Sequence, residues 1–120
     1  DIWTLRNRKF DNRAYLLIAS VDPLVVFYRM GHLRLGMLDY KGSDDLDFNV
    51  HVTNPRFAHN ITNDTSQFIK PYDTLREDLV RRYGEAEGMH RFKKVGQSVM
   101  NAMLTVVYSV KSVWEHKELW

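Results

Sequence analysis

The sequence predicts an α/β protein of the α+β kind, in which an antiparallel sheet is followed by helices that cover it. Three observations lead to this fold class. Short apolar runs rich in β-branched and aromatic residues occupy positions 14–28, and an alternating stretch follows at positions 33–38. In the last third of the chain, apolar residues recur at three- and four-residue spacing, which is typical of an amphipathic helix.

Composition places the chain among single globular domains or parts of one. The 120 residues include 17 Lys and Arg against 15 Asp and Glu, which gives a formal net charge of +2, and 44% of the residues are hydrophobic. These values are typical of a chain with a core and give no support for a disordered or fibrous polypeptide. A chain of this length buries roughly two thirds of its unfolded surface, which is enough for a core without staples.

Several function classes are disfavoured by what the sequence lacks. The absence of cysteine excludes disulfides, thiolate metal sites and cysteine nucleophiles, and it favours a reducing compartment. No stretch approaches the roughly 20 apolar residues of a membrane span, so we expect a soluble protein with no membrane partner. The aromatic residues lie in apolar runs and do not alternate with basic residues, so no nucleic acid partner is expected.

The first part of the chain predicts a meander of three strands. Residues 13–20 contain an apolar run that is too short for a typical helix, and we expect it to be a strand buried on both faces. A turn at residues 21–23 leads to a second strand at residues 24–28. Residues 29–32 then connect this strand to the alternating third strand at residues 33–38.

Helices are predicted in the second half of the chain. Residues 39–49 are polar and predict a solvated loop, and residues 56–72 contain turn formers without a sustained period. A short helix is expected at residues 73–83, where a capping residue begins it and a glycine ends it, and a longer helix at about residues 88–114. The apolar stripe of the longer helix predicts core packing, with a groove for a partner helix as the alternative. The stripe consists of Val95, Val99, Met103, Val106, Val107, Val110 and Trp114.

Charged residues of both signs precede the first predicted strand. Lys9, Asp11 and Arg13 stand at alternate positions, so a strand that extends back through them places all three on one face. A solvated edge strand is the plainer interpretation. The functional alternative is a polar cleft, in which the two cations hold phosphate oxygens and Asp11 orients the lysine or a ligand hydroxyl. Arg34, on the polar side of the alternating strand, adds a third cation if the two strands share a surface.

A second candidate group stands just before Pro55. His51, Thr53 and Asn54 supply hydrogen-bonding groups that suit a ribose, a phosphate or a metal-bound carboxylate, although Asn54 followed by Pro55 also favours a simple turn. The histidines and the acidic loop at residues 44–47 lack the spacing of zinc and calcium sites, so no metal ligand is assigned. The chain contains no glycine-rich phosphate loop and no nucleophile elbow.

Taken in order, these residues resemble the tubulin tyrosine ligase-like family. Residues 8–13, Arg-Lys-Phe-Asp-Asn-Arg, match the family's Lys-Phe-Asp-x-Arg motif, and an apolar strand before Asp-Pro follows. Gly-His-Leu-Arg at residues 31–34, then Tyr40, then His-Val-Thr-Asn at residues 51–54 match the next motifs. The order and the spacing agree across residues 8–54.

The resemblance implies an ATP-grasp fold and an ATP-dependent carboxylate–amine ligase. In this family ATP phosphorylates a carboxylate of tubulin or a similar acidic protein tail, and the amine of an amino acid then displaces the phosphate to form an amide. The amino acid is glutamate, glycine or tyrosine. The implied nucleotide-binding residues are Lys9, Asp11, His51, Thr53 and Asn54. The implied catalytic residues, which stabilise the phosphate and the acyl-phosphate, are Arg13 and Arg34.

The resemblance also implies which parts of the enzyme this chain contains. Residues 1–120 correspond to the central part of the family's catalytic domain. ATP and Mg2+ are the implied cofactors, and we expect the magnesium ligands outside this chain, because the family has them beyond its long helix. The chain alone is therefore expected to be incomplete as an enzyme. The implied partners are tubulin or microtubule tails and the amino acid substrate, in the cytoplasm, the cytoskeleton or the cilium. The alternative is an inactive family member that serves as a structural or microtubule-associated binding module.

Overall fold

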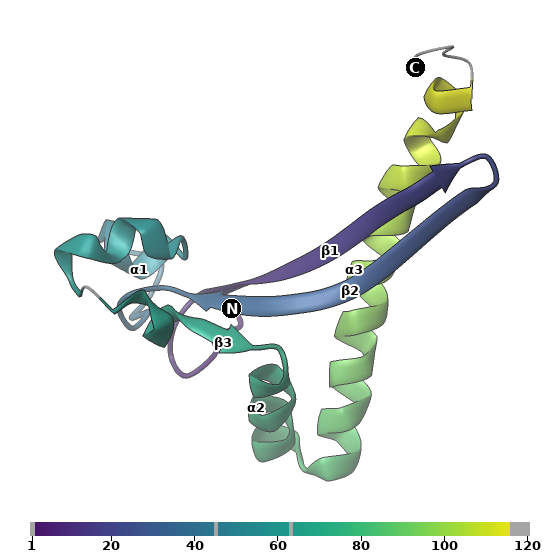
Figure 1. Ribbon diagram of the computed structural model, residues 1–120. Helices are drawn as coiled ribbons and strands as arrows, with labels where there is room; N and C mark the ends of the chain where they lie inside the picture. Colours follow the sequence, from purple (N-terminus) through teal and green to yellow (C-terminus); the bar gives the residue numbers. More distant parts are fainter. Residues whose placement is uncertain (1, 45, 63, 116–120) are drawn as a thin grey trace.

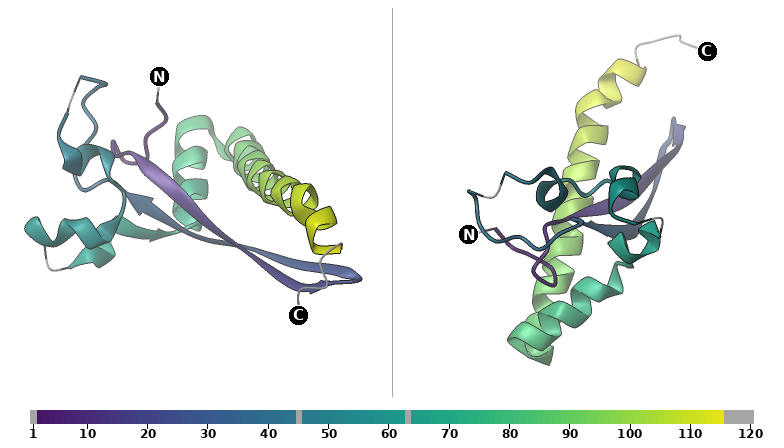
Figure 2. Two further views of the ribbon diagram at one scale, coloured as in Figure 1. Left: turned by 90° about the horizontal axis from the view of Figure 1, so that it is seen from above. Right: turned by 90° about the vertical axis from the view of Figure 1, so that its left-hand side faces the viewer.

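A long two-stranded hairpin forms the centre of the molecule, with small helical turns near one end and a pair of helices packed beside it (Figures 1 and 2). The computed structural model describes residues 2–44, 46–62 and 64–115. Strand β1 (Phe10–Val21) pairs antiparallel with β2 (Leu24–Leu35), and β3 (Ile69–Pro71) pairs with the other edge of β2. The sheet order is therefore β1-β2-β3, and the α+β class predicted from the sequence is confirmed.

The predicted meander is wrong in its connections. Residues 29–32 continue strand β2, and the third strand comes from residues 69–71, inside a predicted loop. Opposite Arg13, β2 carries one extra residue, because the paired positions shift between Asn12 and Ala14. Gly31 fits this bulge, since a Cβ atom there would lie 2.4 Å from the ring of Tyr15. Glycine inside this stretch therefore marks a bulge within one strand, and not a connection between two.

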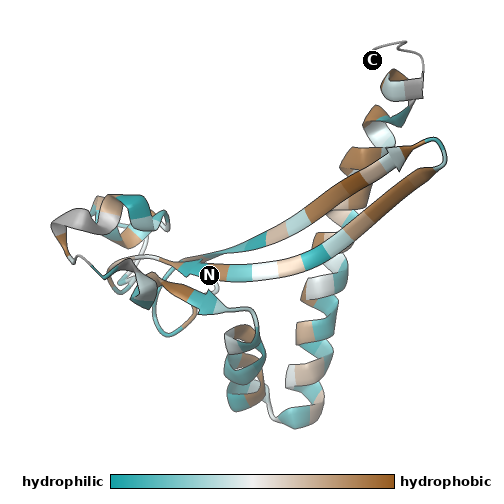
Figure 3. Ribbon diagram, viewed as in Figure 1, coloured by the Kyte–Doolittle hydropathy of each residue, from teal (hydrophilic) through white to brown (hydrophobic). Residues whose placement is uncertain are grey.

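The prediction that the first strand is buried on both faces is also wrong. Side chains of β1 alternate between half-buried and exposed, and helix α3 lies over one face of the hairpin only (Figure 2). On the other face, Leu17 is 63% exposed and its cross-strand partner Phe27 is 61% exposed. Figure 3 shows that hydrophobic residues dominate both strands near the hairpin turn. An uninterrupted apolar run in this sequence therefore does not mean that the strand is buried on both faces.

Both predicted helices are confirmed. Helix α2 (Asp73–Tyr83) ends at Gly84, which has a φ of 80° and whose N–H donates to Val80 O at 2.8 Å. Helix α3 (Glu85–Glu115) starts three residues before the predicted position and runs back beside α2. At Gly88 the two helices are so close that a Cβ atom would lie 2.5 Å from Val80 Cα.

The main core lies between α2, α3 and the face of the sheet that α3 covers. It consists of Leu5, Leu33, Leu35, Leu75 and Leu79, with Phe10, Tyr72, Phe92 and Val95 packed around them. A smaller cluster, Met37 and Phe68 with Val52, joins the segment after β2 to the end of the short helix α1 (Phe48–His51) and to η2 (Thr65–Phe68). Between these two in the chain stands η1 (Pro55–Asn60).

Every member of the apolar stripe of α3 except Val106 is buried or half-buried, which agrees with the predicted core packing. Val95 contacts the main core and Val107 is buried, whereas Val106 is exposed. Adjacent residues on a helix point about 100° apart, so Val106 and Val107 do not face the core together. In the described part of the chain, no helix combines the length and the apolarity needed to cross a membrane.

Candidate functional site

Polar side chains meet at the end of the hairpin that lies away from its turn. Asp11 on β1 and Arg34 on β2 are direct cross-strand partners, so their side chains project from the same face of the sheet. Arg34 Nε donates to both carboxylate oxygens of Asp11, at 2.9 and 3.1 Å, and Nη2 donates to Oδ2 at 2.6 Å. The two side chains are partly buried, with 18% of Arg34 and 34% of Asp11 exposed.

Asp11 receives a further hydrogen bond from the segment that follows α1. The hydroxyl of Thr53 donates to Asp11 Oδ2. Burial acts to raise the pKa of Asp11, but the hydrogen bonds from Arg34 and Thr53 and the charges of Arg34 and Arg13 outweigh it, so the pKa is lowered. The hydrogen bond between Arg34 and Asp11 raises the pKa of Arg34. Asp11 is therefore an ionised group that fixes the guanidinium of Arg34.

Lys9 forms a second set of contacts beside this ion pair. Its Nζ lies 2.5 Å from His51 Nδ1 and 4.8 Å from the centre of the Tyr40 ring. Since an ammonium group has only donors, Nδ1 of His51 is the acceptor. Tyr40 and His51 also meet edge to face, with ring centroids 6.3 Å apart. We call Lys9, Asp11, Arg34, His51 and Thr53 the sheet-end cluster.

Backbone contacts hold α1 against the sheet and so place His51 and Thr53. Asp47 caps α1, because its carboxylate accepts from Asn49 N at 2.8 Å. Asn49 O in turn accepts from the N–H groups of Met37 and Leu38. Gly36 lies against α1, where a Cβ atom would be 2.8 Å from Val50 O. The chain that leaves β2 thus brings α1 next to Lys9.

Two predicted site residues lie outside these contacts. Arg13 is exposed on β1, and among the described residues it forms no ion pair, but its charge reaches Asp11. Asn54 accepts a hydrogen bond from Arg56 N at 3.1 Å and so begins η1, which is the turn role that its position before Pro55 favours. The roles assigned to all seven residues stay predictions.

Tyr40 contacts Lys9 but was not among the candidate site residues predicted from the sequence. It appeared in the sequence as one member of the ordered motif series, but neither its spacing nor its residue type predicts a contact with Lys9. Tyr40 N donates to Asn7 O at 2.7 Å, which anchors the tyrosine beside the segment before β1. A cation over an aromatic ring is attracted to its π face, so Tyr40 stabilises the position of the Lys9 ammonium.

The sheet-end cluster suits an anionic ligand better than a metal ion. In the described ranges, no three His, Asp or Glu side chains lie close enough to hold a metal, and the one carboxylate of the cluster is paired with Arg34. These residues do not fit a magnesium site. Arg34 uses Nε and Nη2 for Asp11, and its Nη1 has no hydrogen-bond partner among the described residues. The cluster can therefore offer directed N–H donors to phosphate oxygens.

The fold and this cluster define an α+β protein with a cationic patch at one end of an antiparallel sheet. A family model described as the tubulin-tyrosine ligase family matches residues 3–108. The chain belongs to this family, and the resemblance seen in its motifs is confirmed. Membership indicates ATP-dependent ligation of the kind that modifies tubulin. Comparison with curated proteins gave no match, and neither did comparison with solved structures.

Proposed function

We propose that the protein joins an amino acid to a carboxylate of tubulin or of a similar acidic protein tail through an acyl-phosphate. The family membership supports the reaction class, and the sheet-end cluster supports the place where phosphate groups bind. The amino acid is glutamate, glycine or tyrosine. The protein then works where tubulin is, in the cytoplasm, the cytoskeleton or the cilium.

The reaction has two steps, and in both a phosphate oxygen departs as the leaving group. In the first, a carboxylate oxygen of the tail attacks the terminal phosphorus of ATP, an O–P bond forms, and the bond to ADP breaks. In the second, the amine of the amino acid attacks the acyl carbon, a C–N bond forms, the C–O bond to the phosphate breaks, and the proton lost by the amine passes to water or to the leaving phosphate. Such steps depend mainly on positioning and on neutralising phosphate charge.

The residues of the sheet-end cluster, together with Arg13 and Asn54, have matching roles in this proposal. Arg34 donates through Nη1 to the transferred phosphate, and Asp11 prevents rotation of the guanidinium by holding Nε and Nη2. Lys9 neutralises a second phosphate from its place between His51 and Tyr40, and Arg13 adds positive charge from the same strand. His51, Thr53 and Asn54 line the nucleotide side. Rigid strands suit this task, because they keep the donors aligned without a reorganisation cost.

The bidentate pair of Asp11 and Arg34 is the observation that supports the proposal most strongly. A solvated edge strand needs no such pair, because each charge is equally stable in water and a surface pair contributes only about 0–1 kcal/mol. Here the pair is partly buried and Thr53 also binds Asp11, so Asp11 is held in place and in turn fixes the orientation of Arg34.

Trapping of the acyl-phosphate tests the proposal directly. A polypeptide that contains this chain is incubated with ATP, a tubulin-tail peptide and hydroxylamine, without an amino acid. The proposal predicts a peptide hydroxamate and an equal amount of ADP, because hydroxylamine displaces the phosphate. If the protein binds tail peptide or microtubules but forms neither hydroxamate nor ADP, it is instead an inactive family member that acts as a binding module.

A further inference from the structure

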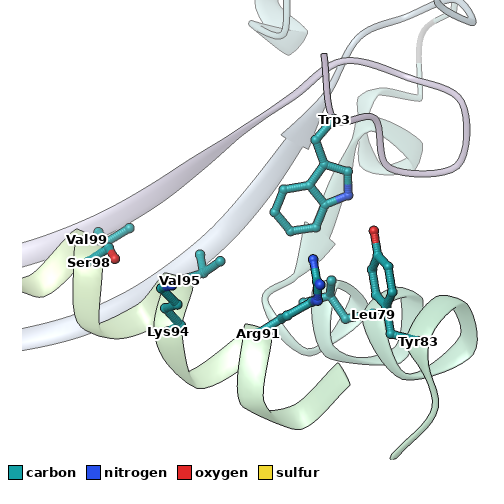
Figure 4. A pocket seen from close by; sticks show the side chains of 8 residues that line it. All are labelled: Trp3, Leu79, Tyr83, Arg91, Lys94, Val95, Ser98 and Val99. Carbon is teal, nitrogen blue, oxygen red and sulfur yellow. The ribbon is translucent and has the colours of Figure 1, made fainter. Parts of the chain in front are cut away.

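A cavity lies on the other side of the sheet from the sheet-end cluster. It has a volume of about 520 Å3 and opens between the N-terminal segment, α2 and α3 (Figure 4). Trp3 packs edge to face on Phe10, with ring centroids 5.4 Å apart, and Phe10 packs against the main core. Because neighbouring strand residues point to opposite faces, this cavity and Asp11 are on different sides of β1. The lining residues are Trp3, Leu79, Tyr83, Arg91, Lys94, Val95, Ser98 and Val99.

The walls of this cavity are apolar and its two aromatic residues are open to solvent. Leu79, Val95 and Val99 supply aliphatic surface, and Trp3 and Tyr83 stand on either side of the opening with more than a third of their surface exposed. Cavities of this size, lined by aromatic and aliphatic side chains, accommodate a ligand group of substantial apolar area. The walls suit a branched or aromatic side chain.

The rim of the cavity is positively charged. Figure 4 shows Arg91 reaching from α3 toward the space between Trp3 and Tyr83, and its Cζ lies 4.1 Å from the centre of the Tyr83 ring. Glu87 binds Arg91 at 2.6 Å and offsets part of its charge, whereas Lys94 forms no ion pair among the described residues. No Asp or Glu is among the residues that line the cavity. A rim of this kind favours a partner with negative charge around an apolar group.

We infer that this cavity binds an acidic polypeptide segment by one apolar side chain, with neighbouring carboxylates held by Lys94 and Arg91. A nucleobase fits less well, since its polar edges would lie partly against the aliphatic side chains of Leu79, Val95 and Val99. If the proposed function holds, the acidic acceptor protein is a ligand of this chemistry, and the cavity binds a part of it remote from the modified carboxylate. The binding itself does not depend on catalysis.

Peptide binding to the 120-residue chain in the absence of ATP tests this inference. The probe is a fluorescein-labelled, glutamate-rich 12-residue peptide with one central leucine, and its anisotropy reports binding. Saturable binding is expected, and replacing the leucine by glycine, or the glutamates by glutamine, weakens it at least tenfold. Absence of saturable binding overturns the inference. Equal binding of the glycine peptide overturns it as well, because the apolar cavity then plays no part.

Two pairs of variants locate the bound peptide. Lys94→Glu reverses a rim charge, and Lys93→Glu makes the same change at an exposed neighbour that does not line the cavity. Ser98→Trp fills the cavity, and Gln97→Trp adds the same bulk at an exposed position outside it. We expect the first member of each pair to weaken binding at least tenfold and the second less than threefold. Equal effects within a pair contradict the inference, provided that circular dichroism shows all four variants folded.

Two further probes and the trapping assay separate the remaining outcomes. Single-stranded oligonucleotides or phosphatidylserine vesicles that bind more tightly than the peptide, and compete with it, overturn the choice of a polypeptide. Failure of the hydroxylamine assay with peptide binding intact removes the proposed ligation and keeps the cavity. Absence of peptide binding, with hydroxamate formation intact, overturns the inference about the cavity and leaves the proposed ligation in place.

Discussion

The side chains of Asp11 and Arg34 face each other across the β1–β2 pair and are joined by three N–H···O contacts of 2.6, 2.9 and 3.1 Å. Thr53, from a segment 42 positions further along the chain, donates to the same carboxylate. The pair thus connects both strands and the segment after α1. We therefore expect its removal to lower the stability of the fold, and its geometry is central to the proposed reaction.

Replacing Asp11 by Asn is expected to lower the free energy of unfolding by about 1–3 kcal/mol, because it leaves Arg34 partly buried without its counter-charge. Urea titration measures the change. Asp39→Asn is the matched control, since Asp39 binds Arg8 at 3.3 Å with 55% of its side chain exposed, and the expected change there is within about 0.5 kcal/mol. Equal changes in the free energy of unfolding for the two substitutions would show that the Asp11–Arg34 pair contributes no more to stability than an exposed ion pair.

The lowered pKa of Asp11 predicts how this stability difference varies with pH. A carboxyl whose pKa is lower in the folded state stabilises the fold above its unfolded-state pKa, and this contribution is lost as the pH falls through the folded-state pKa. The gap in thermal midpoint between wild type and Asp11→Asn is therefore expected to be constant above roughly pH 5 and to shrink at lower pH. A gap that stays unchanged down to about pH 2.5 would contradict an ionised, paired Asp11.

Two glycines of α3 are expected to respond to alanine in opposite directions. Gly88→Ala places a Cβ atom 2.5 Å from the backbone of α2 and is expected to cost about 1–3 kcal/mol. At Gly96 the nearest atom is Tyr72 Oη at 3.7 Å, so Gly96→Ala is expected to gain up to about 1 kcal/mol of helix stability. Denaturant titration of both variants measures the difference, and destabilisation at Gly96 alone would mean that α2 and α3 pack differently.

Isothermal titration of the 120-residue chain with Mg-ATP is expected to show no binding tighter than the millimolar range, about −4 kcal/mol. The described residues include no group of acidic side chains or histidines that fits a magnesium ion, and the cationic contacts alone hold the nucleotide weakly. Micromolar affinity would show that these residues already form a whole nucleotide site.

Sequence patterns predicted the elements whose side-chain period is strong. The 3.6-residue period and the glycine at position 84 predicted both helices, because a buried stripe and a stop signal are local properties. Strand β3 was not predictable, since Ile69–Pro71 is too short for a period and forms only by pairing with β2. The exposure of Leu17 and Phe27 was not predicted, because an apolar run in the sequence does not indicate which face of the strand a helix covers.

The candidate site was predictable where it depends on strand parity. Alternate positions placed Asp11 and Arg34 on polar sides, and the register of the hairpin makes them partners. The contact of Lys9 with Tyr40 was not predictable, because it depends on how the chain returns after β2. Asn54 could be assigned to a turn or to a ligand from the sequence, and the structure shows the turn contact with Arg56.

Substitution of Arg34 by Lys in a polypeptide that contains the chain tests the central claim most directly. Lysine keeps the charge but does not hold Asp11 and a phosphate oxygen with separate, fixed N–H groups. We expect kcat for ligation to a tubulin-tail peptide to fall at least about 100-fold, or roughly 2.7 kcal/mol, with ATP affinity changed much less. Arg29→Lys, at an exposed arginine of the same strand, is the control and is expected to leave kcat unchanged. If Arg34→Lys ligates at the wild-type rate with an unchanged thermal midpoint, Arg34 has no part in phosphate transfer and the proposed site is wrong.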